Sequence, residues 1–184
     1  MKICLVGDKC GKTSIVQRWT QPKKPIKDEN TLAVDMRTMT VSVDNEAEIV
    51  QMWDCSGEKY YMNLLDKYLF NSNVIVICFD LTSTNSWLVA QYWIDRTREK
   101  TRKIPICVIG NKLDKESQRR IKDSIVKSYL KSIEHPYTFY CETSAYTGEN
   151  CKDTLRMIVR ESGRTPHMYT VNDFKKVESR CTIS

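Results

Sequence analysis

The sequence has 184 residues, of which 41% are hydrophobic and 28% charged, and its formal net charge is +6. These proportions are ordinary for one globular domain. Lysines and arginines are interleaved with acidic residues instead of forming one block, which argues against nucleic-acid binding. The first apolar run, at 2–6, is too short for a signal peptide or a membrane span.

Apolar runs typical of buried strands alternate with segments of helical spacing along the chain. In chain order we predict strands at 2–6, 36–43, 47–54, 74–79, 104–109 and 137–141, and helices at about 12–19, 59–70, 85–100, 118–133 and 149–162. The runs 36–43 and 47–54 meet through Asp44-Asn45-Glu46, which predicts a hairpin. Thr84 or Asn85 is the predicted cap of the third helix.

This order of elements predicts an α/β fold. Its sheet should be six-stranded and mostly parallel, with one antiparallel edge strand and helices on both faces. Residues 1–163 hold all the elements and are predicted to form one domain. The pattern dissolves after Gly163, so we expect residues 164–184 to form a flexible tail.

Eight cysteines occur singly, without a Cys-x-x-Cys pair, which argues against a zinc site. Several of them lie inside apolar runs that resemble buried strands. We interpret these as reduced thiols in the core of a cytoplasmic protein, with Cys181 as the exception.

The segment Gly7-Asp8-Lys9-Cys10-Gly11-Lys12-Thr13 joins the first predicted strand to the first helix, which is the position of a phosphate-binding loop. Backbone N–H groups and a helix N-terminus face an anion there, Lys12 can neutralise phosphate oxygens, and the Thr13 hydroxyl can bind Mg²⁺. Only three residues separate the two glycines, whereas the usual motif has four. This shorter loop should offer fewer inward N–H groups or curve more tightly. The predicted phosphate-binding residues are Asp8, Lys9, Cys10, Gly11, Lys12, Thr13 and Ser14.

Trp53-Asp54-Cys55-Ser56-Gly57 ends the third predicted strand, at the carboxyl edge of the sheet and beside the phosphate loop. A carboxylate at Asp54 can hold the magnesium ion, directly or through water, and the N–H of Gly57 can contact a γ-phosphate.

Asn111-Lys112-Leu113-Asp114 follows the predicted strand at 104–109 and is the most selective signal in the chain. The Asp114 carboxylate can accept hydrogen bonds from N1 and the 2-amino group of guanine, which adenine lacks, while the stem of Lys112 packs over the base. Glu142-Thr143-Ser144-Ala145, after the last strand, supplies a backbone N–H for guanine O6. Four motifs in this order, each just past a strand, predict a guanine-nucleotide site.

From residue 2 to about 162 the sequence resembles the Ras-like small GTPases, which are P-loop NTPases with a G-domain fold. Thr31-Leu32-Ala33-Val34-Asp35-Met36 resembles the Rab stretch that begins with the switch I threonine, and 53–61 and 68–73 resemble later Rab signatures. The Rho branch fits less well, because the interval 114–142 lacks its helical insert.

The resemblance implies a switch that binds GTP and GDP with Mg²⁺, hydrolyses GTP, and acts in membrane traffic. Effectors would bind switch I (22–36) and switch II (57–70), and an exchange factor and a GTPase-activating protein would control the cycle. Thr13, Thr31 and Asp54 would hold magnesium, and Thr31, Gly57 and Glu58 would act at the γ-phosphate. The residues implied around the base are Asn111, Lys112, Asp114, Ser144, Ala145 and Tyr146.

Several positions depart from the family pattern, all of them around the nucleotide. Glu58 replaces the glutamine that orients the attacking water; it loses the amide donor and adds negative charge, so we predict slow intrinsic hydrolysis. Lys24 replaces a base-covering aromatic, which should speed nucleotide release, and Tyr146 replaces a lysine. The alternative is a weakly binding or non-hydrolysing module that keeps the G-domain shape. A P-loop kinase or ATPase would not need the residues predicted to bind guanine, so these two classes fit the sequence less well.

Cys181-Thr182-Ile183-Ser184 fits the C-a-a-X pattern, and the terminal serine favours farnesylation of Cys181. One lipid chain binds membranes only marginally, and Lys175, Lys176 and Arg180 add a modest basic supplement. We therefore expect a cytoplasmic protein that attaches reversibly to the cytosolic face of a membrane.

Overall fold

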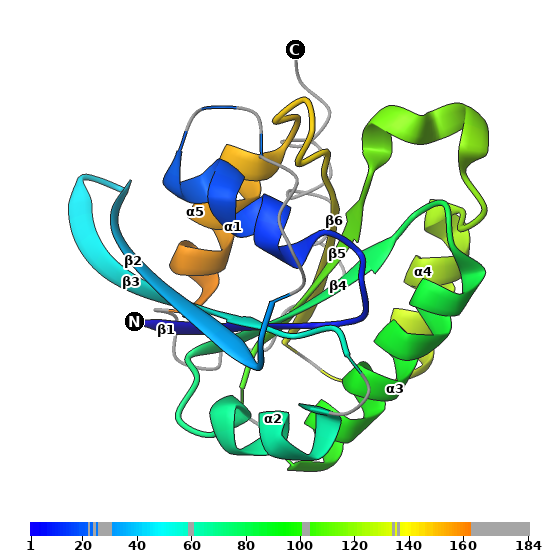
Figure 1. Ribbon diagram of the computed structural model, residues 1–184, viewed down its shortest axis with the longest axis horizontal. Coiled ribbons are helices and arrows are strands. Elements are labelled where there is room, and N and C mark those ends of the chain that lie inside the picture. The colour runs from blue at the N-terminus through cyan, green and yellow to red at the C-terminus, as the bar shows by residue number, and fades with distance from the viewer. Residues whose placement is uncertain are drawn as a thin grey trace.

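The computed structural model describes residues 1–21, 23, 25, 31–58, 61–100, 104–133, 135 and 137–162. In chain order its elements are β1 (Lys2–Val6), α1 (Lys12–Thr20), β2 (Val34–Val43), β3 (Glu46–Cys55), α2 (Met62–Leu69), β4 (Val74–Asp80), α3 (Thr84–Lys100), β5 (Ile106–Asn111), the 3-10 helix η2 (Leu113–Gln118), α4 (Asp123–Ser132), β6 (Thr138–Glu142) and α5 (Cys151–Ser162). Figure 1 shows a central twisted sheet with helices packed around it.

The sheet has six strands in the order β2-β3-β1-β4-β5-β6. All neighbouring strands run parallel except β2 and β3, which form the antiparallel edge. Val43 pairs with Glu46, so Asp44 and Asn45 alone make the turn, with φ angles of 53° and 67°. Positive φ at both positions is what a two-residue hairpin turn requires, and asparagine and aspartate tolerate it well. The predicted fold class is confirmed.

Alternate residues of β1 enter different cores, because side chains alternate across a strand. Ile3 and Leu5 pack with α1 and α5 on one face of the sheet, while Cys4 and Val6 pack with α2, α3 and α4 on the other. Figure 1 shows the same division of the helices between the two faces. A strand buried on both faces explains why 2–6 is continuously apolar.

The predicted helix at 118–133 was wrong at its start. The chain forms η2 first, and α4 begins only at Asp123, after an extended Lys122. The N–H groups of Arg120 and Ile121 both donate to the carbonyl of Leu81, at 2.9 and 3.1 Å, which ties this segment to the end of β4 and prevents a continuous helix.

The cap of α3 also differs from the prediction. Thr84 is the first helical residue, and Ser83 before it accepts a hydrogen bond from the N–H of Ser86 through its Oγ, at 3.2 Å. Ser83 therefore satisfies a helix N–H that Thr84 or Asn85 had been expected to cap.

All seven cysteines in the described part of the chain are free and buried. None of the helices in these ranges is both long enough and apolar enough to cross a membrane. The predicted tail at 164–184, with Cys181, lies outside the described residues, as do Lys24 and residues 22 and 26–30 of switch I and 59–60 of switch II.

Candidate functional site

The predicted motifs meet at one edge of the sheet. The loops after β1, β3, β5 and β6 all leave the carboxyl ends of their strands, and in a parallel sheet these ends share one edge. In sheets of this kind ligands bind in the crevice outside the carboxyl ends of the strands.

Two glycines shape the loop between β1 and α1. Gly7 has a φ of 137°, and a Cβ added there would lie 2.2 Å from the carbonyl oxygen of Cys78. Gly11, with a φ of 92°, caps α1 in the left-handed conformation, and a Cβ there would lie 2.7 Å from Nδ2 of Asn111. Only glycine permits both this backbone geometry and this close packing.

The loop curves tightly, in line with its missing residue. The N–H of Cys10 donates to the carbonyl of Asp8 at 2.8 Å, which closes a three-residue turn with Lys9 at its apex. This bond occupies the N–H of Cys10, which a loop one residue longer could have directed inward, toward a phosphate. The Lys12 ammonium is nearly buried and donates to the carbonyls of Asp8 and Gly7, at 2.6 and 3.1 Å. The predicted phosphate-binding lysine thus lies inside the curve of the loop.

Other predicted phosphate residues have structural partners. The Asp8 carboxylate accepts a hydrogen bond from Ser86 of α3 at 2.7 Å, which anchors the loop. The Cys10 side chain is buried in the core with α1 and α5, so Cys10 can face a phosphate only through its backbone. Ser14 is half-buried in the first turn of α1.

The three predicted magnesium ligands lie together. Oγ1 of Thr13 donates to Oδ2 of Asp54 at 2.5 Å and lies 2.9 Å from Oγ1 of Thr31. Oδ1 of Asp54 is buried without a hydrogen-bond partner. Burial raises the pKa of the Asp54 carboxyl, although the Thr13 hydroxyl and the Lys12 charge oppose this shift. A cation at this point would compensate a carboxylate that its surroundings leave under-satisfied.

These donors suit a hard cation that keeps other oxygen ligands. Two hydroxyls and one carboxylate are the groups that Mg²⁺ uses when phosphates and waters complete its shell. Within the described ranges, no group of three or more His, Cys, Asp or Glu side chains could hold a metal by itself.

The loop after β3 presses against the phosphate loop. A Cβ added to Gly57 would lie 2.6 Å from the carbonyl carbon of Asp8, so only glycine allows this approach. The next residue, Glu58, forms an ion pair with Lys9 in which Oε1 and Nζ are 2.7 Å apart. The N–H of Glu58 donates to Oγ of Ser56 at 3.3 Å. The predicted catalytic residues Gly57 and Glu58 therefore border the phosphate loop.

Asn111 bridges two loops. Its side chain is buried; Nδ2 donates to the carbonyl of Cys10 at 3.0 Å, and Oδ1 accepts from the N–H of Ala145 at 3.1 Å. The segment 142–145 was predicted to supply a backbone N–H to guanine O6, and in this structure the N–H of Ala145 is directed to Asn111. Asn111 therefore joins the phosphate loop to the loop after β6.

The other predicted guanine residues surround this bridge. Lys112 has a left-handed backbone with φ of 69°, and its Nζ lies 2.6 Å from Oδ2 of Asp80. Although burial opposes ionisation of Asp80, hydrogen bonds from Lys112 and Thr82 hold its carboxyl pKa below the usual value. Ser144 donates to Oδ1 of Asp114 at 2.5 Å.

Tyr146 is the most exposed of the predicted guanine residues that follow β6. Its side chain is exposed, and its carbonyl accepts a hydrogen bond from Arg18 of α1 at 2.5 Å. Arg18 also donates to the carbonyl of Ala145 at 3.0 Å. Arg18 thus ties the loop after β6 to α1.

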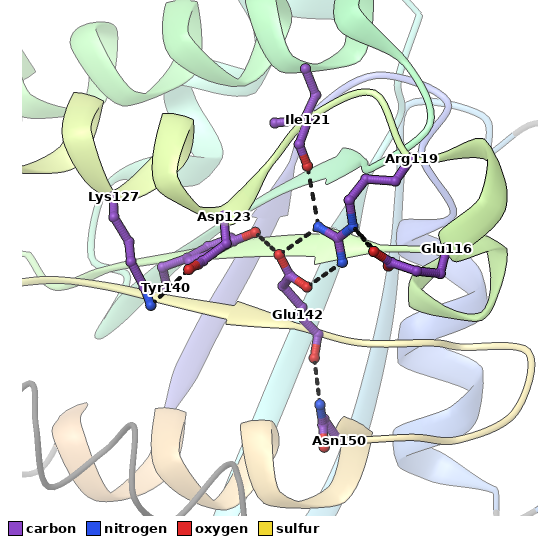
Figure 2. Close-up of polar contacts among 8 residues, drawn as sticks. All are labelled: Glu116, Arg119, Ile121, Asp123, Lys127, Tyr140, Glu142 and Asn150. Atoms are coloured by element: carbon purple, nitrogen blue, oxygen red, sulfur yellow. Dashed lines mark hydrogen bonds and ion pairs between the residues drawn. The ribbon is translucent and has the colours of Figure 1, made fainter.

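A polar network that no sequence motif indicated lies beside this region and is drawn in Figure 2. The Arg119 guanidinium donates to both carboxylate oxygens of Glu142, at 2.9 and 2.7 Å, and to Glu116 at 2.7 Å. Tyr140 donates to Glu142 at 2.6 Å, and Asn150 donates to the Glu142 carbonyl at 2.9 Å. Glu142 was visible in the sequence as the start of a motif, whereas nothing in the sequence singled out Arg119.

The network connects the two segments predicted to read guanine. Arg119 directly follows η2, which contains Asp114, and Glu142 ends β6, two residues before Ser144. Burial opposes ionisation of Glu142, but the hydrogen bonds from Arg119 and Tyr140 outweigh it and lower the pKa of its carboxyl.

Comparison with known proteins shows which family this chain resembles over most of its length. The family model described as "Ras family" matches residues 2–164. The chain is 30% identical over 161 residues to human EF-hand calcium-binding domain-containing protein 4B, in an alignment that covers 86% of this chain and 22% of that protein. It is 30% identical to the mouse Ras and EF-hand domain-containing protein homolog and 31% identical to the Xenopus tropicalis Ras and EF-hand domain-containing protein, each over 165 residues and 87% of this chain. The chain spans only 26% and 23% of the lengths of these two proteins.

Proposed function

This chain belongs to the Ras family of GTP-binding switch domains, and we propose that it binds GTP and GDP with Mg²⁺ at the edge of the sheet described above and hydrolyses GTP slowly. The observation that carries the proposal is the meeting of Thr13, Thr31 and Asp54 beside a nearly buried Lys12. Three segments far apart in sequence supply these groups, and together they match the charge and ligands of a magnesium-bound polyphosphate.

Phosphate binding follows from the loop between β1 and α1. The N-terminus of α1 directs backbone N–H groups and a positive dipole toward an anion. The Lys12 ammonium, held by loop carbonyls, is placed to exchange those contacts for phosphate oxygens. The tight turn at Cys10 removes one N–H from this set, so we expect weaker phosphate binding than a full-length loop would give.

Thr13, Thr31 and Asp54 would hold Mg²⁺, which when bound neutralises phosphate charge during hydrolysis. The orphaned Oδ1 of Asp54 supports this assignment, because a buried carboxylate oxygen without a partner is costly in the absence of a cation. Thr31 belongs to the predicted switch I, so its hydroxyl would link this segment to the nucleotide state.

Base recognition is assigned to the loops joined by Asn111. Asp114 is exposed and can accept guanine donors, and Ser144 holds one of its oxygens at 2.5 Å. The Lys112 stem is positioned by the ion pair with Asp80. Ala145 and Tyr146 complete the rim of this proposed base site.

Glu58 supports slow hydrolysis. It occupies the position that, by resemblance, orients the attacking water, and a carboxylate there places negative charge near phosphates. The same residue and the tight phosphate loop favour the second candidate, a weakly binding or non-hydrolysing interaction module.

The cellular role is a further part of the proposal. Effectors would contact switch I (22–36) and switch II (57–70), and an exchange factor and a GTPase-activating protein would set the nucleotide state. A Rab-like role in membrane traffic is supported by the stretches at 31–36, 53–61 and 68–73 that resemble Rab signatures. A prenylated Cys181 would attach this cytoplasmic protein reversibly to the cytosolic face of a membrane.

The test is to purify the chain and identify the nucleotide that remains bound. One GDP or GTP per chain, lost when Mg²⁺ is chelated, is the expected result. Single-turnover hydrolysis of loaded GTP then separates the two candidates, because a measurable rate supports the slow GTPase and a zero rate supports the interaction module. A chain that binds no guanine nucleotide would contradict both the binding site and the switch.

A further inference from the structure

Lys9 and Glu58 form an ion pair between two different loops of the candidate site. Their Nζ and Oε1 atoms are 2.7 Å apart. Lys9 is at the apex of the tight turn closed by Cys10 and Asp8, and Glu58 follows the glycine that packs against Asp8. The pair therefore lies where the phosphate loop and the loop after β3 touch.

Stability does not explain this pair. The Lys9 side chain is 61% exposed and the Glu58 side chain 40% exposed, and ion pairs in such surroundings contribute little to folding. The pair instead brings a positive charge to a carboxylate whose negative charge would otherwise stand beside the γ-phosphate. The position of the pair between the two loops and the positive charge of Lys9 both suit a role in GTP hydrolysis.

We propose that Lys9 is a positioning residue that neutralises Glu58, so that the Glu58 carboxylate can orient the attacking water without repelling the γ-phosphate. This inference rests on the proposed GTPase function. The proposal relates the two unusual features of the site, the shortened phosphate loop and Glu58, because the shortened loop places Lys9 at the apex of a turn that faces Glu58.

In the reaction, the water oxygen forms a bond to the γ-phosphorus as the bond from phosphorus to the bridging oxygen breaks. The bridging electron pair leaves on GDP, and a water proton is carried off with the released phosphate. Glu58 accepts a hydrogen bond from the water during attack. Lys9 touches neither water nor phosphate in this scheme and acts only through the Glu58 charge.

The experiment is a double-mutant cycle on the full chain loaded with GTP and Mg²⁺, with single-turnover hydrolysis as the readout. Lys9→Met should slow hydrolysis roughly tenfold, less than the loss of a fully buried electrostatic group because both partners are partly exposed. Glu58→Gln should hydrolyse faster than the natural chain. Adding Lys9→Met to Glu58→Gln should change its rate less than about threefold, because no charge remains to neutralise.

Two controls separate this role from a structural one. Lys9→Arg keeps the charge and should retain the natural rate within about threefold. Lys127→Met removes a similarly exposed lysine, paired with Asp123 at 2.9 Å on α4, and should not affect hydrolysis.

Equal slowing by Lys9→Met in the natural chain and in the Glu58→Gln variant would overturn the coupling, as would an unchanged rate when Lys9→Met is made in the natural chain. A natural chain that binds no guanine nucleotide would refute the proposed function, and this inference with it. A natural chain that hydrolyses GTP independently of Lys9 would refute the inference alone.

Discussion

Replacing Arg119 by methionine tests whether the network in Figure 2 holds the two base-reading segments together. Methionine keeps much of the apolar stem but removes the guanidinium. The Arg119 and Glu142 side chains are only 15% and 18% exposed, so Glu142 would keep a mostly buried carboxylate that still accepts a hydrogen bond from Tyr140 but has lost the guanidinium. A hydrogen bond to a charged group contributes about 1.5–3 kcal/mol. Because the two bonds to Glu142 are lost, the bonds to the exposed Glu116 add little, and some water can enter, we expect Arg119→Met to lower the free energy of unfolding by about 2–3 kcal/mol.

The effect should depend on pH in a defined direction. Folding lowers the pKa of the Glu142 carboxyl below its ordinary value of 4.5. Such a group stabilises the folded state fully at pH values above 4.5, and this contribution is lost as the pH falls through the lower, folded pKa. The destabilisation by Arg119→Met should therefore be largest near neutral pH and shrink in acid, where Glu142 becomes protonated and no longer needs the guanidinium.

The assay is urea unfolding at fixed GDP and Mg²⁺ concentrations, because bound ligand adds its own stability. Arg156→Met is the matched control: Arg156 forms an exposed pair with Asp153, 3.6 Å apart on α5, and its loss should cost less than about 0.5 kcal/mol. Adding Glu142→Gln to Arg119→Met should recover part of the lost stability, since the unpaired charge disappears. An Arg119→Met variant as stable as the Arg156→Met control at neutral pH would refute this reasoning.

Asp54→Asn should raise stability in the absence of nucleotide and Mg²⁺, because a buried carboxylate is replaced by a neutral amide. The same change should lower the Mg²⁺-dependent affinity for GDP at least roughly tenfold. Calorimetric unfolding measures the first effect and GDP titration with and without Mg²⁺ the second, and retained Mg²⁺ dependence would remove Asp54 from the metal site. Asp114→Ala should collapse the preference for GTP over ITP, which lacks the 2-amino group, to within a few-fold in competition binding; an intact preference would assign base reading elsewhere. Cys181→Ser should move the protein from the membrane to the soluble fraction of cells, and unchanged partitioning would exclude Cys181 as the lipid site.

The fold class and the order of the motifs could be predicted from the amino-acid sequence. Strand periodicity, the glycines at 7 and 11, and Asp44-Asn45 are local signals, because each follows from the backbone conformation or burial of a few consecutive residues. The placement of each motif just after a strand was equally local, and the parallel sheet then brought those ends to one edge. The convergence of Thr13 and Asp54 was predictable for this reason.

The pairing of side chains across loops, in contrast, depends on the tertiary structure. Asn111 joins Cys10 to Ala145, Lys9 meets Glu58, and Arg119 reaches Glu142, over sequence separations that no local pattern encodes. The break between η2 and α4 has the same origin, since a carbonyl at the end of β4 captures the N–H groups that a continuous helix would have used. Such contacts depend on strand order and on the path of each loop above the sheet, and these are fixed only when the whole chain packs.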